Sequence, residues 1–129
     1  GIIWQVVIGK FPGWKDLETG HETGVDCIHE EKKIIMELKN SYNTHNSGSR
    51  KAFMDKLAKY KKEHPEYRCI WGIVNAKNHI SKKEIITHDG QKIEKLQEDE
   101  LLDMIFTYQG INYKKQIIEH MQNIMYPSV

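Results

Sequence analysis

The segment Ile34–Lys39 (IIMELK) constrains this chain most, because its apolar and charged residues alternate with the period of a β-strand. Successive side chains of an extended strand point to opposite faces, so Ile35, Glu37 and Lys39 share one face. The other face is apolar throughout, formed by Ile34, Met36 and Leu38. We expect the apolar face to pack against a core and the charged face to line a cleft.

A second short strand is predicted just before this one. Residues 25–28 (VDCI) have the composition of a strand, and the charged stretch 29–33 fits the return connection of a hairpin. Pairing of the two strands places Asp26 beside Glu37. The two carboxylates then converge on one side of the hairpin.

Two converging carboxylates supply the hard oxygen ligands that Mg²⁺ prefers. A phosphodiester is a natural substrate for such a site, because the cation polarises the phosphoryl group and lowers the pKa of an attacking water. Lys39 adds a positive charge on the same face, to orient or deprotonate the water or to neutralise charge in the transition state. Asp26, Glu37 and Lys39 are therefore candidate catalytic residues, the two acids as metal ligands.

A Glu-x-Lys triplet on a strand is also a common exposed ion pair, and by itself it is a weak signal. Three features of the surrounding sequence favour the nuclease interpretation. An aspartate lies on the preceding strand, an apolar stripe lies on the opposite face, and a polar loop follows directly.

Three segments together resemble a known family. FPGW (11–14), TGHETGVDC (19–27) and IIMELKNSYNTHNSGS (34–49) are similar to the core of type II restriction endonucleases that cut GGNCC-type sites, within the PD-(D/E)XK nuclease superfamily. The glycine-rich approach, the D…E-x-K trio and the polar run occur together and in order. The second half of the chain resembles the family mainly in expected architecture.

The resemblance implies roles for particular residues. It makes Asp26 and Glu37 the metal-binding acids and Lys39 the catalytic lysine, with Mg²⁺ as the cofactor. It also places a polar segment near the active site and the DNA, formed by Asn40, Asn43, Thr44, Asn46 and Ser47. It further implies double-stranded DNA as the partner, a GGNCC-like target and a homodimer, since a palindromic site matches twofold protein symmetry.

The chain departs from the family pattern in two places. The superfamily's Pro-Asp pair is Val25-Asp26 here, and the change is chemically harmless because the proline binds no metal. Family members also have a segment upstream of FPGW, which we expect this chain to lack, and in them that segment can supply another acidic ligand. Glu22 is then the expected substitute ligand, with Glu18 further from the motif.

Composition fits a single nuclease-like domain over residues 1–129. Nineteen Lys and Arg balance eighteen Asp and Glu, so a DNA surface has to come from local clustering of charge. Cys27 and Cys69 lie in apolar strands without metal-site spacing, which favours buried thiols in a reducing cytoplasm over a zinc site. No apolar stretch is long enough to span a bilayer, and no secretory signal is present. We expect a cytoplasmic protein without membrane contact.

The remaining segments predict a mixed α/β fold. A loop is expected up to Thr23, and a helix over 50–63 with Ser47 or Ser49 as its N-cap. The apolar run 68–76 predicts a strand buried on both faces beside the Glu-x-Lys strand. A hairpin is expected around Asp89-Gly90, and two helices over 97–108 and 113–125.

Basic residues cluster directly after the candidate site loop, at Arg50, Lys51, Lys56, Lys59, Lys61 and Lys62. Arg50 and Lys51 are closest to that loop and are the expected phosphate contacts, although a solvated amphipathic helix explains the cluster equally well. The hairpin around Asp89-Gly90 favours an edge ribbon over a ribbon that enters a DNA groove.

These patterns predict a restriction-endonuclease-like α/β core, with a central mixed sheet flanked by helices. The predicted function is Mg²⁺-dependent endonucleolytic cleavage of DNA by a type II restriction enzyme or a shortened relative. Two alternatives stay open, a repair or recombination nuclease with the same core and a non-catalytic DNA-binding module. Structure-selective cutting would identify the first, and indifference to Mg²⁺ the second.

Overall fold

The computed structural model of the chain describes residues 2–17, 23–41 and 47–125. The helices are α1 (Ile2–Lys10), α2 (Ser47–Glu63), α3 (Asp99–Ile105) and α4 (Lys114–Met125), with a 3-10 turn η1 (Lys77–His79). The strands are β1 (Trp14–Asp16), β2 (Cys27–His29), β3 (Ile34–Ser41), β4 (Arg68–Asn75), β5 (Lys82–His88), β6 (Gln91–Gln97), β7 (Thr107–Tyr108) and β8 (Ile111–Asn112). Within these residues, no helix is long and apolar enough to cross a membrane.

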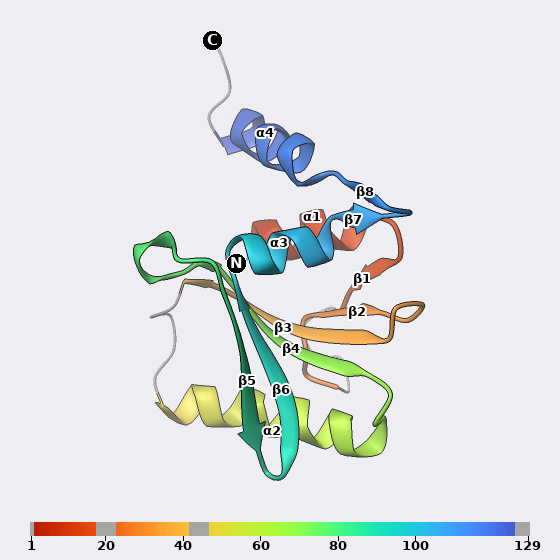
Figure 1. Cartoon of the computed structure of the whole chain (residues 1–129), viewed down its shortest axis with the longest axis vertical. Helices are drawn as coiled ribbons and strands as arrows, with labels where there is room; N and C mark the ends of the chain where they lie inside the picture. Colours follow the sequence, from red (N-terminus) through yellow and green to blue (C-terminus); the bar gives the residue numbers. More distant parts are fainter. Residues whose placement is uncertain (1, 18–22, 42–46, 126–129) are drawn as a thin grey trace.

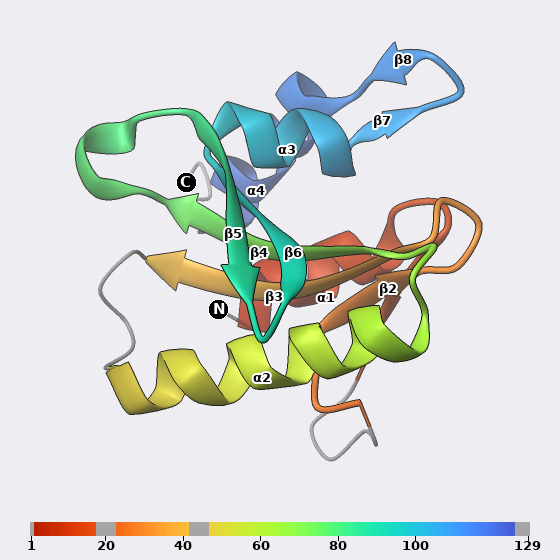
Figure 2. The same cartoon turned by 60° about the horizontal axis from the view of Figure 1, so that its bottom comes forward.

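The described part of the chain forms one six-stranded sheet in the order β1-β2-β3-β4-β6-β5. The pairs β3·β4 and β4·β6 are parallel, and the pairs on both sides of them are antiparallel. Helix α2 connects β3 to β4 across one face of the sheet, and α1 and α3 lie on the other face (Figures 1 and 2). This confirms the predicted mixed sheet flanked by helices.

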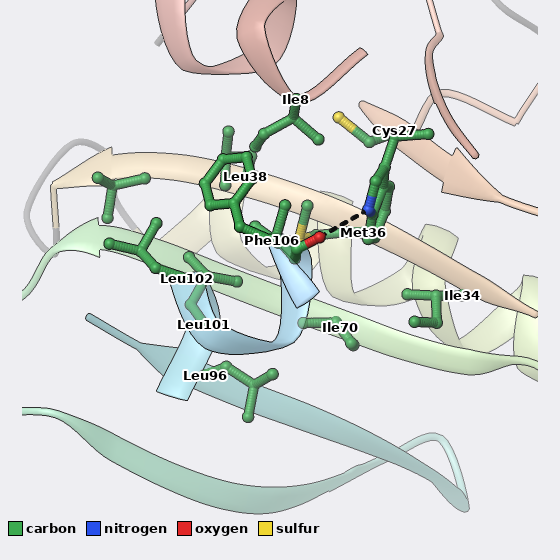
Figure 3. Close-up of a cluster of buried hydrophobic side chains, with 13 residues drawn as sticks. Ile8, Cys27, Ile34, Met36, Leu38, Ile70, Leu96, Leu101, Leu102 and Phe106 are labelled. Carbon is green, nitrogen blue, oxygen red and sulfur yellow. Dashed lines mark hydrogen bonds between the residues drawn. The ribbon is translucent and has the colours of Figure 1, made fainter. Parts of the chain in front are cut away.

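Two apolar clusters hold these layers together. Ile34, Met36 and Leu38 of β3 pack toward α1 and α3, in a cluster that includes Ile8, Leu101 and Phe106 (Figure 3). Ile35 packs toward α2 in the second cluster, with Phe53, Met54, Leu57 and Ala58. The apolar face of β3 is therefore buried as predicted. The charged face does not line an open cleft at Ile35, because α2 covers it.

Helix α2 confirms the predicted amphipathic helix, but it begins at Ser47 rather than Arg50. Ser49 thus lies inside the first turn, and of the two suggested caps only Ser47 lies at the boundary. The buried residues of α2 are Phe53, Met54, Leu57 and Ala58, spaced to form one face as expected.

Strand β4 is buried on both faces and runs parallel to β3, as predicted. Gly72 lies at its centre, where α3 crosses closely. A Cβ atom at this position would lie 2.7 Å from Leu101 Cδ1 and 3.2 Å from Met36 Sδ. The glycine therefore permits the close approach of α3 to the sheet.

The C-terminal part contains the two predicted helices, and α4 lies close to its predicted range of 113–125, but the first helix is shorter than the predicted 97–108. Gln97 ends β6, α3 spans only Asp99–Ile105, and residues 107–108 pair with 111–112 as the ribbon β7·β8. The two turn residues, Gln109 and Gly110, have positive φ angles of 50° and 78°. Two-residue hairpin turns need such angles, but glutamine is not among the residues that signal them. The predicted loop after Trp14 is also wrong in part, because β1 forms there.

The hairpin β5·β6 confirms the turn predicted at Asp89-Gly90, and β5 is an edge strand of the sheet. His88 Nε2 lies 2.6 Å from Asp55 Oδ1 of α2. This contact fixes the tip of the hairpin against the helix.

Arg68 and Glu94 join β4 to β6 through two parallel hydrogen bonds, of 2.9 Å from Nε and 2.7 Å from Nη2. Burial raises the pKa of Glu94, but the bonds from Arg68 outweigh it and the pKa lies below its ordinary value of 4.5. The pair therefore stabilises the fold above pH 4.5, and this contribution is lost as the pH falls through the lowered pKa.

We expect Glu94→Gln to lower the free energy of unfolding by about 1–3 kcal/mol at neutral pH, because a bidentate charged pair is lost. The difference from the unmodified protein should shrink below a pH of about 4. Urea unfolding at neutral pH and at a pH below about 4 measures this difference in the free energy of unfolding. Glu84→Gln, which removes a more exposed carboxylate on the same hairpin, should have a smaller effect. Equal effects of the two changes would contradict the prediction.

Candidate active site

Asp26 and Glu37 lie side by side at one end of the β2·β3 hairpin. Cys27 of β2 pairs with Met36 of β3, so Asp26, directly before β2, lies opposite Glu37 in the continued register. The Leu38 backbone N–H donates a hydrogen bond of 2.8 Å to Asp26 Oδ2. Asp26 is therefore fixed against β3 by the backbone of the Glu-x-Lys segment itself.

Glu37 is a buried carboxylate, with 7% of its surface exposed. Its Oε1 lies 3.4 Å from Lys39 Nζ, whereas the buried Oε2 has no hydrogen-bond partner among the described residues. Burial, and then the charge of Asp26, raise the pKa of Glu37 to about 7 against the opposing effect of Lys39. A buried carboxylate oxygen without a partner is costly to the fold, which points to a functional reason for it.

The pKa of Asp26 is also raised, chiefly by burial. The Leu38 N–H and the Lys39 charge act in the opposite direction, and Asp16 adds to the rise. Burial of both groups, together with the charge of Asp26 beside Glu37, therefore disfavours the charged forms of these carboxylates. Two neighbouring carboxylates of this kind fit a divalent cation with oxygen ligands, since its charge would offset both.

Lys39 is held beside Glu37 by an aromatic ring. Its Nζ lies 4.8 Å from the centroid of Phe53, a buried residue of α2. Because α2 packs on the sheet through this residue, the helix positions the lysine as well as covering the core. The side chain keeps 24% of its surface exposed, so its ammonium group can reach solvent or substrate.

Asp16 is a third carboxylate near the site that the sequence did not single out. Gln5 of α1 donates hydrogen bonds of 2.8 Å to Asp16 Oδ1 and 3.3 Å to the Asp26 carbonyl oxygen. The Leu17 N–H donates a further bond of 2.7 Å to that carbonyl. Helix α1 and strand β1 therefore hold Asp26 in place. Prediction of strand β1 at residues 14–16, which pairs with β2, would have placed Asp16 near Asp26.

A second group of potential metal ligands lies elsewhere, where α2 meets the tip of β5·β6. Asp55, His88 and Asp89 each offer one ligand atom, and these three atoms lie within 4.8 Å of one another. Both Asp55 oxygens already have partners, since Oδ1 contacts His88 at 2.6 Å and Oδ2 accepts from Lys51 at 2.8 Å. Glu37 differs in having an oxygen that has no hydrogen-bond partner within the described part of the chain. We therefore place the candidate catalytic centre at Asp26 and Glu37.

The predicted DNA-binding residues fall into two sets. Asn40, Ser47, Arg50 and Lys51 are exposed, at the end of β3 and the start of α2. Arg50 stacks on the Trp71 ring, with Cζ 4.6 Å from the centroid, and Lys51 pairs with Asp55. Asn43, Thr44 and Asn46 lie outside the described residues, as do the suggested acids Glu18 and Glu22.

The two cysteines are buried free thiols, as predicted. Burial, and then the nearby charges of Asp26, Asp16 and Glu37, raise the pKa of Cys27. Burial raises the pKa of Cys69 to about 12. Neither group is a thiolate at neutral pH, so neither provides a soft metal ligand beside the carboxylates.

Comparison with known proteins gives two matches. The family model described as Eco47II restriction endonuclease matches residues 1–123. Among curated proteins, the type II restriction enzyme Eco47II of Escherichia coli is 40% identical over 48 residues. This alignment covers 37% of the chain and 19% of the relative, so it spans about a fifth of that protein's length. No solved structure matches the chain.

Proposed function

The chain belongs to the Eco47II restriction endonuclease family, and from that premise we propose that it cleaves double-stranded DNA as a Mg²⁺-dependent, site-specific deoxyribonuclease. One observation supports the proposal most directly. Asp26 and Glu37 form a carboxylate pair with raised pKa values, and one buried Glu37 oxygen has no hydrogen-bond partner among the described residues. Such a pair fits a divalent cation at the point where the family's chemistry requires one.

In this proposal each residue of the trio has a defined task. Asp26 and Glu37 would hold Mg²⁺ through carboxylate oxygens. When bound, the ion polarises the phosphoryl group and lowers the pKa of an attacking water. Lys39, 3.4 Å from Glu37, donates hydrogen bonds to that water or to a phosphate oxygen and offsets the negative charge that develops there. The Leu38 N–H holds one oxygen of Asp26 and so orients its carboxylate.

The recognition mode rests on the resemblance to GGNCC-cutting enzymes. We propose a palindromic target of that type and a homodimer, in which each subunit cuts one strand. Asn40, Ser47, Arg50 and Lys51 are exposed at the end of β3 and the start of α2, and they are the proposed DNA contacts among the described residues.

Incubation of the purified protein with plasmid DNA, in Mg²⁺ and in EDTA, tests the proposed function. Metal-dependent fragments whose mapped ends share one short sequence are expected. Asp26→Asn protein prepared in parallel is the control for contaminating nucleases. Intact DNA in Mg²⁺, with the protein folded, would overturn the proposal in favour of a binding module. Cuts confined to branched or flapped substrates would overturn it in favour of a repair nuclease.

A further inference from the structure

A row of side chains connects the candidate active site to the β5·β6 hairpin across one face of the sheet. Glu37 pairs with Trp71 of β4, and Trp71 pairs with Lys95 of β6. Lys95 in turn pairs with Glu84 of β5. Because neighbouring strands lie about 4.8 Å apart, the Lys95 backbone is about 10 Å from that of Glu37.

The far end of this row opens into a hollow of about 410 Å³. Lys77, Lys82 and Lys95 line it, together with Gln97 and Glu84. We call these five residues the basic pocket. Three lysines against one glutamate leave an excess of positive charge, although the whole chain has a net charge of only +1.

Arg50 joins this positive region through Trp71. Lys95 Nζ lies 4.4 Å and Arg50 Cζ 4.6 Å from the centroid of the Trp71 ring. The indole is buried, so both cations contact one ring whose position is fixed by the core. Burial lowers the pKa of Lys95, Glu84 opposes that shift, and Arg50 and Lys82 add to it. Two cations on one buried ring concentrate positive charge where an anion can bind.

Glu84 is the built-in counter-charge of the basic pocket. Its carboxylate lies 2.6 Å from Lys82 Nζ and 3.9 Å from Lys95 Nζ. It holds the two lysines together when no anion is present. An incoming phosphate therefore competes with Glu84 for the same ammonium groups.

We propose that the basic pocket and Arg50 bind backbone phosphates of the DNA duplex, a few nucleotides from the phosphodiester at Asp26 and Glu37. This inference rests on the proposed function and adds a second contact surface for its substrate. Phosphates follow one another every 3.4 Å or so along the axis of each strand, so a site about 10 Å away meets the same duplex. Such contacts position the DNA without reading its sequence.

Fluorescence anisotropy with a labelled duplex of mixed sequence, in EDTA over a series of salt concentrations, tests this inference. Loss of one phosphate contact lowers the salt slope by about 0.9 and the affinity by about eightfold at roughly 0.1 M salt. Lys82→Gln and Lys95→Gln should each show this loss. Lys62→Gln is the matched control, because it removes the same charge about 18 Å along α2 from Arg50.

Glu84→Gln provides a test with the opposite sign. Removal of the counter-charge should tighten DNA binding, by up to about eightfold. A misfolded variant cannot bind more tightly, so this result would separate charge from stability. Affinities and salt slopes for the Lys82, Lys95 and Glu84 variants that match the Lys62 control would overturn the inference.

Cleavage is measured separately, so the two proposals can fail independently. Binding that depends on the basic pocket, without any cleavage in Mg²⁺, supports this inference and overturns the proposed nuclease. Site-specific cleavage, with DNA binding unchanged in the pocket variants, supports the proposed nuclease and overturns this inference. A protein that does not bind duplex DNA at all contradicts both.

Discussion

Asp26→Asn and Lys39→Met are each expected to lower the rate of DNA cleavage by at least about a hundredfold. Asn keeps an oxygen to accept the Leu38 N–H but loses the charge that would hold Mg²⁺. Met keeps the aliphatic stem over the Phe53 ring but loses the ammonium group beside Glu37. Cleavage rates under single-turnover conditions measure both losses, and circular dichroism confirms that the variants are folded.

Asp55→Asn is the matched control for these changes. It removes a carboxylate from the second group of potential ligands, at Asp55, His88 and Asp89. Cleavage should persist in this variant, because that group lies at the hairpin tip and not beside Lys39. A large loss in Asp55→Asn, with Asp26→Asn still active, would move the catalytic centre to the hairpin tip and contradict our assignment.

Glu37→Gln is expected to abolish cleavage and at the same time to stabilise the fold by about 2–3 kcal/mol at pH 8 or so. The folded-state pKa of Glu37 is about 7, above its ordinary value of 4.5. Between these two values the folded state keeps a proton that the unfolded state releases, so stability falls as the pH rises through this window. Gln has no proton to lose and avoids the cost of burying the charge.

Chemical denaturation at several pH values measures this effect. The two proteins should differ least near pH 4.5 and most above pH 7. A variant less stable than the unmodified protein at all pH values would contradict the prediction. It would mean that the Lys39 ion pair outweighs the cost of burying the carboxylate.

Mg²⁺ should offset the destabilising effect of the buried Glu37 charge in the unmodified protein. A ligand that binds only the folded state raises its stability by mass action, so the melting temperature should rise with Mg²⁺ concentration. Glu37→Gln, which lacks the charged ligand, should show a much smaller rise. Equal shifts in the two proteins would place the metal elsewhere, and Asp55→Asn would then be the variant to examine.

The local order of side chains was determined by the sequence alone. Alternation along residues 34–39 correctly divided β3 into an apolar face toward α1 and α3 and a second face with Glu37 and Lys39. The Asp89-Gly90 pair correctly indicated a hairpin, because few residues adopt positive φ without strain. The polar face of α2 was also predictable, since helical spacing separates its lysines from Phe53 and Leu57. Each of these features depends only on residues close together in the chain.

The burial of the site residues, their pKa values and their supporting contacts were decided by the tertiary structure. Glu37 is buried because α2 and β4 cover it, and no pattern near residue 37 specifies how closely that helix packs. Asp16 and Gln5 support Asp26 from β1 and α1, and the basic pocket forms only because β6 inserts between β4 and β5. Strand order joins residues far apart in the sequence, so burial, raised pKa values and clustered charge follow from packing that local periodicity does not encode.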